Sequence, residues 1–124
     1  MKRILVIDDE PDVAELMRLF LEVLSYEADI FLSCEEALEA INNTEYWAVF
    51  CDYMMPGLTG DKLFKAVRDA DNRLAKRFII ITGAVLDERL SRFLETETVR
   101  VVNKPFRFED IRDILTEVEQ IEKQ

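Results

Sequence analysis

Several residues that can bind a cation or an anion follow short apolar runs in this sequence. Asp8 and Asp9 come directly after one such run, and Asp52, Thr82 and Lys104 come after three others. Carboxylates that lie close together repel one another and tend to take up protons unless a cation neutralises them. An all-oxygen cluster suits a hard ion such as Mg²⁺. These residues therefore predict a magnesium site with a hydroxyl and an ammonium beside it, provided that the fold brings them together.

The apolar runs have the length and composition of β-strands. They are too short for helices and consist mostly of β-branched or aromatic residues. The five predicted strands cover residues 4–7, 28–31, 47–51, 78–81 and 99–102.

The segments between the runs have the period of a helix. Pro11 suits a first turn, and Ser33 with Glu36 forms a capping box for a second helix that continues through Ile41. Two more helices are predicted over residues 61–70 and 87–94. The first and fifth predicted helices each carry an apolar stripe, formed by Val13, Leu16, Met17, Phe20, Leu21 and Leu24 and by Ile111, Ile114, Leu115, Val118 and Ile121.

Strict alternation of strand and helix over five units predicts an α/β fold. Such a chain forms a doubly wound parallel sheet with right-handed crossovers and helices on both faces. In these sheets the ligand site lies outside the carboxyl ends of the strands. The acidic residues, the hydroxyl and the ammonium should therefore converge at one edge, where Mg²⁺ would offset the carboxylate charges.

Composition limits the classes of function. The chain has 124 residues, of which 49% are hydrophobic, enough for one compact core and too few for two ordinary domains. Its formal net charge of −10 opposes binding to nucleic acid phosphates and anionic membrane surfaces. No apolar stretch is long enough to cross a bilayer, and the N-terminus lacks a signal-peptide pattern. We therefore expect a cytoplasmic domain with no membrane insertion and no direct nucleic acid binding.

Histidine and cysteine usage narrows the chemistry further. The sequence contains no histidine, so imidazole bases, imidazole metal ligands and phosphohistidine are excluded within this chain. Cys34 and Cys51 have neither the spacing of a metal site nor the number of a disulfide framework. We expect both thiols to be reduced and structural.

Four segments, in this order and spacing, resemble the receiver domain of two-component response regulators: "VIDDEP", "VFCDYMMPGLTG", "IIITGA" and "VVNKPF". The resemblance covers essentially the whole chain, so residues 1–124 are expected to form one receiver domain. It implies a flavodoxin-like sheet of order 2-1-3-4-5 with five helices. It also implies a signalling switch rather than a turnover enzyme, phosphorylated by a histidine kinase or a histidine phosphotransfer protein.

The resemblance assigns roles to individual residues. Asp52 is the implied phosphoacceptor. Asp9, Asp52 and the Met54 backbone carbonyl are the implied direct Mg²⁺ ligands, and Asp8 acts mainly through water.

Thr82 and Lys104 are implied to contact the phosphoryl oxygens. A carboxylate that attacks an anionic phosphoryl group needs charge neutralisation, which Mg²⁺ and Lys104 provide. Movement of the Thr82 hydroxyl toward the phosphoryl group would then bias the following loop and the fourth predicted helix.

The sequence departs from the receiver pattern at Val101, where receivers often have Tyr or Phe, so the usual coupling of the switch hydroxyl to an aromatic ring is in doubt. "TGA" and "FLETETVRVVNKPF" look more like receivers of hybrid sensor kinases than like those of DNA-binding regulators. A stand-alone receiver and a hybrid-kinase receiver both remain open. The output partner is accordingly either an effector protein or the kinase domains of the same protein.

Three other functions compete with this interpretation. A Mg²⁺-dependent phosphatase that forms a phospho-aspartate usually needs a carboxylate two residues after the nucleophile, where this chain has Met54. A pure binding module with an unused pocket would not require the complete set of acidic residues, Thr82 and Lys104. The presence of this set argues against such a module. Flavin binding would need a Ser/Thr/Gly phosphate loop after the first strand, which is missing.

Val13, Pro105 and Phe106 form a candidate docking site for a helix of the phosphodonor. A purely structural role, in which these residues only close the core, stays equally open.

Overall fold

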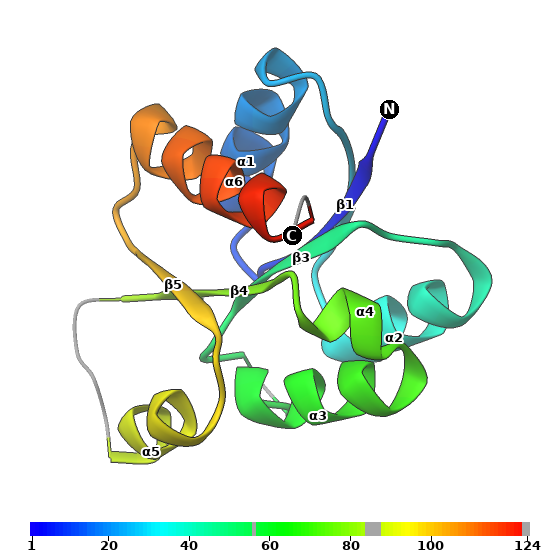
Figure 1. Ribbon diagram of the computed structural model, residues 1–124, viewed down its shortest axis with the longest axis vertical. Helices are drawn as coiled ribbons and strands as arrows, with labels where there is room; N and C mark the ends of the chain where they lie inside the picture. Colours follow the sequence, from blue (N-terminus) through cyan, green and yellow to red (C-terminus); the bar gives the residue numbers. More distant parts are fainter. Residues whose placement is uncertain (56, 84–87, 123–124) are drawn as a thin grey trace.

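The computed structural model describes residues 1–55, 57–83 and 88–122, and in this part of the chain five parallel strands form one sheet. The order across the sheet is β2-β1-β3-β4-β5, so the predicted flavodoxin-like α/β fold is confirmed (Figure 1). The strands are β1 (Arg3–Ile7), β2 (Glu27–Phe31), β3 (Ala48–Asp52), β4 (Phe78–Thr82) and β5 (Arg100–Asn103).

Three strands end one residue later than predicted. Asp52, Thr82 and Asn103 are the last residues of β3, β4 and β5, because backbone pairing continues past the apolar side chains. Asp52 pairs with Ile81, and Thr82 pairs with Asn103. The sheet itself therefore fixes the backbone of two predicted site residues.

Helices cover both faces of the sheet. α1 (Pro11–Val23) and α6 (Phe108–Glu122) lie on one face, where their apolar side chains pack with Ile4, Val6 and Phe50 (Figure 1). On the other face lie α2 (Cys34–Asn43), α3 (Gly60–Ala70), α4 (Asn72–Ala75) and α5 (Glu88–Thr96). Since β3 and β4 lie between these two layers, each of their residues is buried.

The predicted number of five helices is wrong, since six helices occur in the described residues. The additional helix is α4, a single turn whose N-cap is Asp71. Asp71 Oδ1 accepts hydrogen bonds from the backbone N–H groups of Arg73 and Leu74, at 3.0 and 3.2 Å. Four residues are too few to show a helical period, so this helix depends on its cap rather than on an apolar stripe.

The prediction of a buried apolar stripe on α1 is only partly correct. Met17 and Leu21 are buried as predicted, and Ala14 joins them, but Leu16 is 41% exposed. The buried side of α1 thus centres on positions 14, 17 and 21, which lie on one face of the helix.

α2 and α5 each end two residues later than predicted, at Asn43 and Thr96. Ser33 Oγ accepts a hydrogen bond from the Glu36 N–H at 3.3 Å, which confirms the N-cap of α2. The first residue of the fourth predicted helix, Asp87, and Pro56 of the "YMMPGLTG" loop lie outside the described residues.

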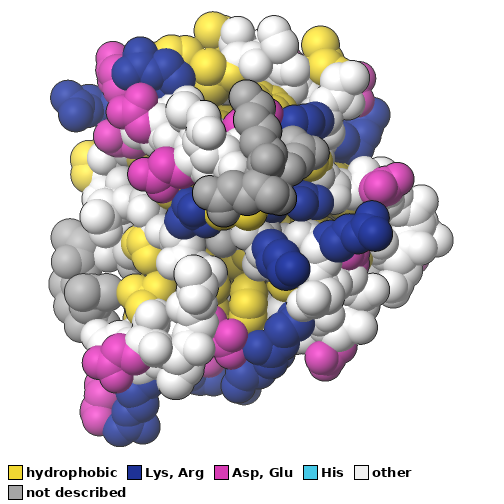
Figure 2. Space-filling view, in the orientation of Figure 1, with side chains coloured by type: hydrophobic (Ala, Val, Ile, Leu, Met, Phe, Trp, Pro, Cys, Tyr) yellow, Lys and Arg dark blue, Asp and Glu magenta, His cyan; other side chains and the backbone are white. Residues whose placement is uncertain are grey.

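The surface is strongly charged. Figure 2 shows Lys, Arg, Asp and Glu side chains over much of one face, with hydrophobic side chains visible in smaller areas between them. No helix in the described ranges is long and apolar enough to cross a membrane.

Gly60, the first residue of α3, lies where even a Cβ would make tight contacts. A Cβ at this position would be 3.0 Å from Ile80 Cδ1 and 3.1 Å from Tyr53 Cα. The Gly60 N–H also donates a hydrogen bond to the Tyr53 carbonyl at 2.9 Å. The start of α3 is therefore packed directly against the chain that follows Asp52.

We predict that Gly60→Ala destabilises the protein by about 1–2 kcal/mol, because overpacking outweighs the better helix propensity of alanine. A Cβ on Gly83 would meet nothing within 4 Å. Gly83→Ala is thus the matched control, with an expected change within about 0.5 kcal/mol. Urea unfolding curves measure both, and equal midpoints for the two variants would contradict the packing argument.

Candidate functional site

The carboxyl edge of the sheet brings the predicted site residues together. Asp8 and Asp9 follow β1, Asp52 and Thr82 end β3 and β4, and Lys104 follows β5. A hollow of about 430 Å³ opens at this edge, and it is lined by Asp9, Glu10, Asp52, Met54, Thr82, Gly83 and Lys104. This geometry agrees with the prediction that the acidic residues, Thr82 and Lys104 converge at one edge of the sheet.

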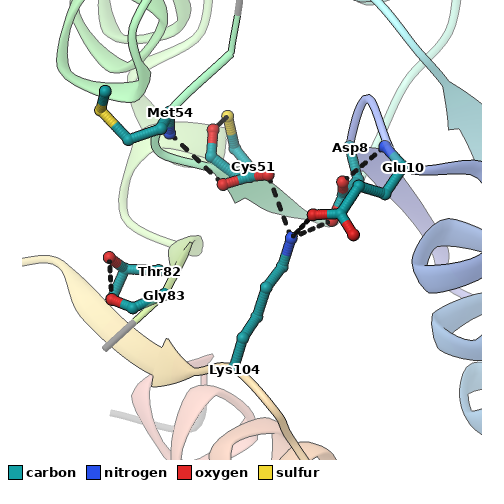
Figure 3. A network of polar contacts seen from close by, with 8 residues as sticks. Asp8, Glu10, Cys51, Met54, Thr82, Gly83 and Lys104 are labelled. Carbon is teal, nitrogen blue, oxygen red and sulfur yellow. Dashed lines mark hydrogen bonds and ion pairs between the residues drawn. The ribbon is translucent and has the colours of Figure 1, made fainter. Parts of the chain in front are cut away.

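Lys104 is the centre of the site's charge network. Its Nζ lies 3.0 Å from Asp8 Oδ2, 3.1 Å from Asp52 Oδ2 and 3.1 Å from Glu10 Oε1. Figure 3 shows the Lys104 side chain reaching up between these carboxylates, away from Thr82 and Gly83. One ammonium therefore acts as the counter-ion for residues that follow β1 and end β3.

Burial makes this ammonium necessary. Asp8 is 1% exposed and Asp52 is 7% exposed, so neither carboxylate is well hydrated. Burial raises the pKa of Asp52, and the charge of Asp8 raises it further, whereas the hydrogen bond from Lys104 lowers it; the net pKa is above the ordinary value. Burial lowers the pKa of Lys104, but its hydrogen bonds to Asp8 and Asp52 outweigh this effect and raise it overall.

The oxygen atoms at this edge fit a hard divalent cation. Asp8, Asp9, Glu10 and Asp52 each offer one carboxylate oxygen, and these four atoms lie within 4.8 Å of one another. Asp8 Oδ2 is buried and faces the Lys104 ammonium at 3.0 Å, so it keeps spare acceptor capacity. A set of carboxylate oxygens with spare acceptor capacity is the kind of site that binds Mg²⁺.

Glu10 belongs to this site, although the sequence analysis did not include it. Its backbone N–H donates to Asp8 Oδ1 at 2.9 Å, and its side chain contacts Lys104. The run of three acidic residues before Pro11 was the available signal, because a proline at the first helical position places Glu10 at the N-cap, beside the strand end.

Met54 and Thr82 line the hollow, and the Thr82 carbonyl accepts a hydrogen bond from the Lys104 backbone N–H at 2.7 Å. The Met54 N–H donates to Asp52 Oδ1 at 3.3 Å, and the Met54 side chain is 62% exposed. The Thr82 hydroxyl donates to the Gly83 carbonyl at 3.0 Å (Figure 3). The predicted roles of the Met54 carbonyl as a metal ligand and of Thr82 as a phosphoryl contact stay predictions.

A second, more apolar hollow of about 320 Å³ adjoins the site. It is lined by Glu10, Val13, Leu16, Lys104, Pro105 and Phe106. The structure thus brings Val13, Pro105 and Phe106 together, as the sequence analysis expected. The Lys104–Pro105 peptide bond is cis.

Both cysteines are free, as predicted, and both are buried. Burial raises the pKa of the Cys34 thiol to about 11 and that of Cys51 well above its usual range. Thiols in this state are protonated near neutral pH and therefore poor nucleophiles.

Comparison with known proteins gives a family match over most of the chain. The model of the response regulator receiver domain matches residues 4–116. The chain is 30% identical over 105 residues to the regulatory protein VanR of Enterococcus faecium, covering 85% of this chain and 44% of VanR. It is 27% identical over 119 residues to hybrid signal transduction histidine kinase L of Dictyostelium discoideum, covering 91% of this chain and 7% of that kinase.

The chain spans about half the length of the related regulators. It covers 44% of VanR and 51% of the regulatory protein VanRB of Enterococcus faecalis, to which it is 29% identical over 119 residues, or 96% of this chain.

Solved structures share the fold over nearly the full chain. The response regulator TrrA of Thermotoga maritima, solved in complex with Mg²⁺ and BeF, has a TM-score of 0.80 and 30% identity, covering 94% of this chain and 98% of TrrA. A CheY-like receiver domain protein of Methanospirillum hungatei has a TM-score of 0.88 and 24% identity, covering 100% of this chain and 99% of that one.

We predict that Lys104→Met destabilises the protein in metal-free buffer by about 2 kcal/mol. Removing one partner of a fully buried ion pair costs ~3–5 kcal/mol, and the cost should be smaller here because the site is open to solvent on one side. Addition of Mg²⁺ should narrow the difference, since a cation would again compensate Asp8 and Asp52. Thermal or urea unfolding with and without Mg²⁺ measures both effects.

Lys65→Met is the matched control for the lost charge. Lys65 is exposed on α3, and no ion pair of this residue occurs within the described ranges. Its replacement should change stability by less than about 0.5 kcal/mol. Equal effects of the two substitutions would show that Lys104 is not the counter-ion of the site.

Proposed function

The chain belongs to the family of response regulator receiver domains, and we propose that residues 1–124 act as one phosphoacceptor domain of a two-component phosphorelay. Asp52 accepts a phosphoryl group from a phosphohistidine on a histidine kinase or a histidine phosphotransfer protein. The observation that carries this proposal is the surroundings of Asp52. Its Oδ2 lies 3.1 Å from Lys104 Nζ, and it belongs to a group of four carboxylates whose oxygens lie within 4.8 Å of one another.

The transfer step replaces one bond to phosphorus with another. A carboxylate oxygen of Asp52 attacks the phosphorus and forms a P–O bond, the P–N bond to the donor imidazole breaks, and the nitrogen keeps the electron pair. Lys104 would move its hydrogen bonds from the carboxylates to the phosphoryl oxygens, which carry more negative charge. Thr82, on the neighbouring strand, would turn its hydroxyl from the Gly83 carbonyl to the same group.

Mg²⁺, when bound, supplies positive charge that offsets the repulsion between Asp52 and the phosphoryl group. In this proposal Asp9, Asp52 and the Met54 carbonyl hold the ion directly, and Asp8 acts mainly through water. The lining of the hollow supports this division: Asp9, Asp52 and Met54 line it, whereas Asp8 does not line it and is 1% exposed.

The domain works as a switch rather than as a turnover enzyme. The phosphoryl group adds charge and acceptor oxygens at Asp52, which draws the Thr82 hydroxyl toward it and shifts α5 between two arrangements. Val101 packs at the edge of the hydrophobic cluster that contains Leu90 and Phe93 of α5. Because valine is too small to act as an aromatic latch, we expect α5 to change more than residue 101.

The hollow beside Lys104 is the proposed docking site for the phosphodonor. Val13, Leu16 and Phe106 supply an apolar surface, and the hollow shares Glu10 and Lys104 with the phosphorylation site. An apolar side chain of a donor helix that fills it would bring the phosphohistidine next to Asp52. The exposure of Leu16, at 41%, favours docking over a purely structural role for this residue.

The output is proposed to pass through protein contacts, to an effector protein or to kinase domains of the same protein. VanR and VanRB are regulatory proteins about twice as long as this chain. This chain itself carries a formal net charge of −10, which opposes DNA binding. The phosphatase alternative is disfavoured, because the position of its acid–base carboxylate is occupied by Met54.

We predict that acetyl phosphate with Mg²⁺ adds one phosphoryl group to the wild-type protein and none to Asp52→Asn, which lacks the nucleophile. Intact-mass spectrometry measures the adduct. Asp9→Asn should need about tenfold or more Mg²⁺ for the same labelling, because it removes a charged ligand.

Asp69→Asn is the control for this experiment, since Asp69 is exposed on α3 away from the hollow. It should be labelled like the wild type. An undiminished adduct in Asp52→Asn, or labelling that persists after chelation of Mg²⁺, would refute the proposed mechanism.

We predict that Leu16→Glu slows phosphoryl transfer from a histidine kinase that labels the wild-type protein by about tenfold or more, as expected for loss of an apolar anchor. Labelling by acetyl phosphate, which needs no docking surface, should be unchanged. Leu19→Glu is the control, because Leu19 is 47% exposed on α1 but does not line the hollow. If both variants accept phosphate from the kinase at equal rates, the hollow is not the docking site.

A further inference from the structure

We propose that the start of α3 couples the phosphoacceptor to α5 through Asp61 and Arg89, as a route additional to Thr82. This inference rests on the proposed function, because it concerns how a phosphoryl group on Asp52 affects α5. It assigns Asp61 and Arg89 as positioning residues of the switch, and neither contacts the reacting atoms.

The first part of the route joins Asp52 to the start of α3. Asp52 Oδ1 accepts a hydrogen bond from the Met54 N–H at 3.3 Å, and phosphorylation changes the charge and direction of that carboxylate. Tyr53, the residue between them, accepts the Gly60 N–H at 2.9 Å through its carbonyl. The backbone of Tyr53 is also in close contact with Gly60, where even a Cβ would be 3.1 Å from the Tyr53 Cα. A shift of Tyr53 therefore has to move Gly60.

The second part joins the start of α3 to α5. Asp61 follows Gly60 and is buried, at 8% exposure. Its Oδ1 accepts a short hydrogen bond from the Thr59 hydroxyl, and its Oδ2 accepts one from Arg89 Nε at 3.1 Å. Burial raises the pKa of Asp61, but these hydrogen bonds outweigh it and lower the pKa overall, so the carboxylate stays charged. Arg89 is in the first turn of α5, so displacement of Asp61 acts on the end of α5 nearest to Thr82.

Side chains of α5 and of the residue after it meet α3 at three positions, beside a hollow of about 660 Å³ between the two helices. Asp61 pairs with Arg89, the Phe64 and Phe93 rings meet edge to face with centroids 5.4 Å apart, and Arg68 pairs with Glu97 at 2.9 Å. The three positions on α3 are spaced by three and four residues, which places them on one face of the helix. Movement at the start of α3 would therefore reach α5 through these side-chain contacts.

A route through α3 is consistent with the residue at position 101. Val101 offers no large ring to follow the Thr82 hydroxyl, whereas the contacts from Asp52 to Arg89 are contiguous. The test compares the two ends of the contact between α3 and α5.

The experiment measures hydrogen exchange of α5 in the full chain with and without Mg²⁺ and beryllofluoride, a phosphoryl mimic. Arg89→Gln removes the ion pair near Asp52, and Arg68→Gln removes the ion pair at the far end as a matched control. Both arginines are partly exposed, at 50% and 39% of their side chains, so both variants should fold. Arg89→Gln should reduce the ligand-induced change in α5 exchange about twofold or more, and Arg68→Gln should leave that change largely intact.

The outcomes separate this inference from the proposed function. Fluorine NMR reports whether beryllofluoride binds, and binding that is lost in Asp52→Asn identifies the phosphoacceptor. If the wild type binds no beryllofluoride, the proposed function fails. If it binds but Arg89→Gln and Arg68→Gln reduce the α5 response equally, or neither reduces it, the route through Asp61 and Arg89 is refuted while the phosphoacceptor assignment stands.

Discussion

The compensation of buried carboxylates by one ammonium is the interaction on which the site depends. Asp8 and Asp52 are almost fully buried, and their nearby cation is Lys104, within 3.1 Å of both. Two such charges repel strongly where water does not screen them, so the arrangement persists only with a cation between them. Whatever binds at this edge, a metal ion or a phosphoryl group, must therefore change the contacts of Lys104.

The sheet holds these opposed charges in place. β1 pairs with both β2 and β3, and Ile7 lies opposite Cys51, so the residues that follow them, Asp8 and Asp52, come out side by side. β1 from Ile4 onward and the whole of β3 are buried, and a slip by one residue would turn every side chain to the opposite face. The packing of β1 and β3 thus fixes the distance between two carboxylates that would otherwise move apart.

The sequence predicted those parts of the fold in which many residues share one apolar pattern. Five apolar strands and alternating helices determine the sheet, and the strand ends determine the edge where Asp52 and Lys104 meet. The sequence missed α4, because one turn of helix capped by Asp71 has no period, and it missed Glu10, because that contact depends on how α1 leaves the edge. It also placed Leu16 on the buried stripe, since periodicity alone does not define how wide a buried face is.

The energies that hold α5 are of the right size for a switch. One ion pair joins Arg89 of α5 to α3, and another joins Glu97, the residue after α5, to Arg68. Both arginines are partly exposed, and such pairs contribute about 0–1 kcal/mol each. The edge-to-face contact of Phe64 and Phe93 adds about 0.5–1.5 kcal/mol beyond the burial of the rings. A hydrogen bond to a charged group contributes about 1.5–3 kcal/mol, so one or two new bonds to a phosphoryl group can outweigh these contacts. The core strands, buried on both faces, are held by far larger packing energies, and for this reason phosphorylation can reposition α5 without disturbing the sheet that carries Asp52.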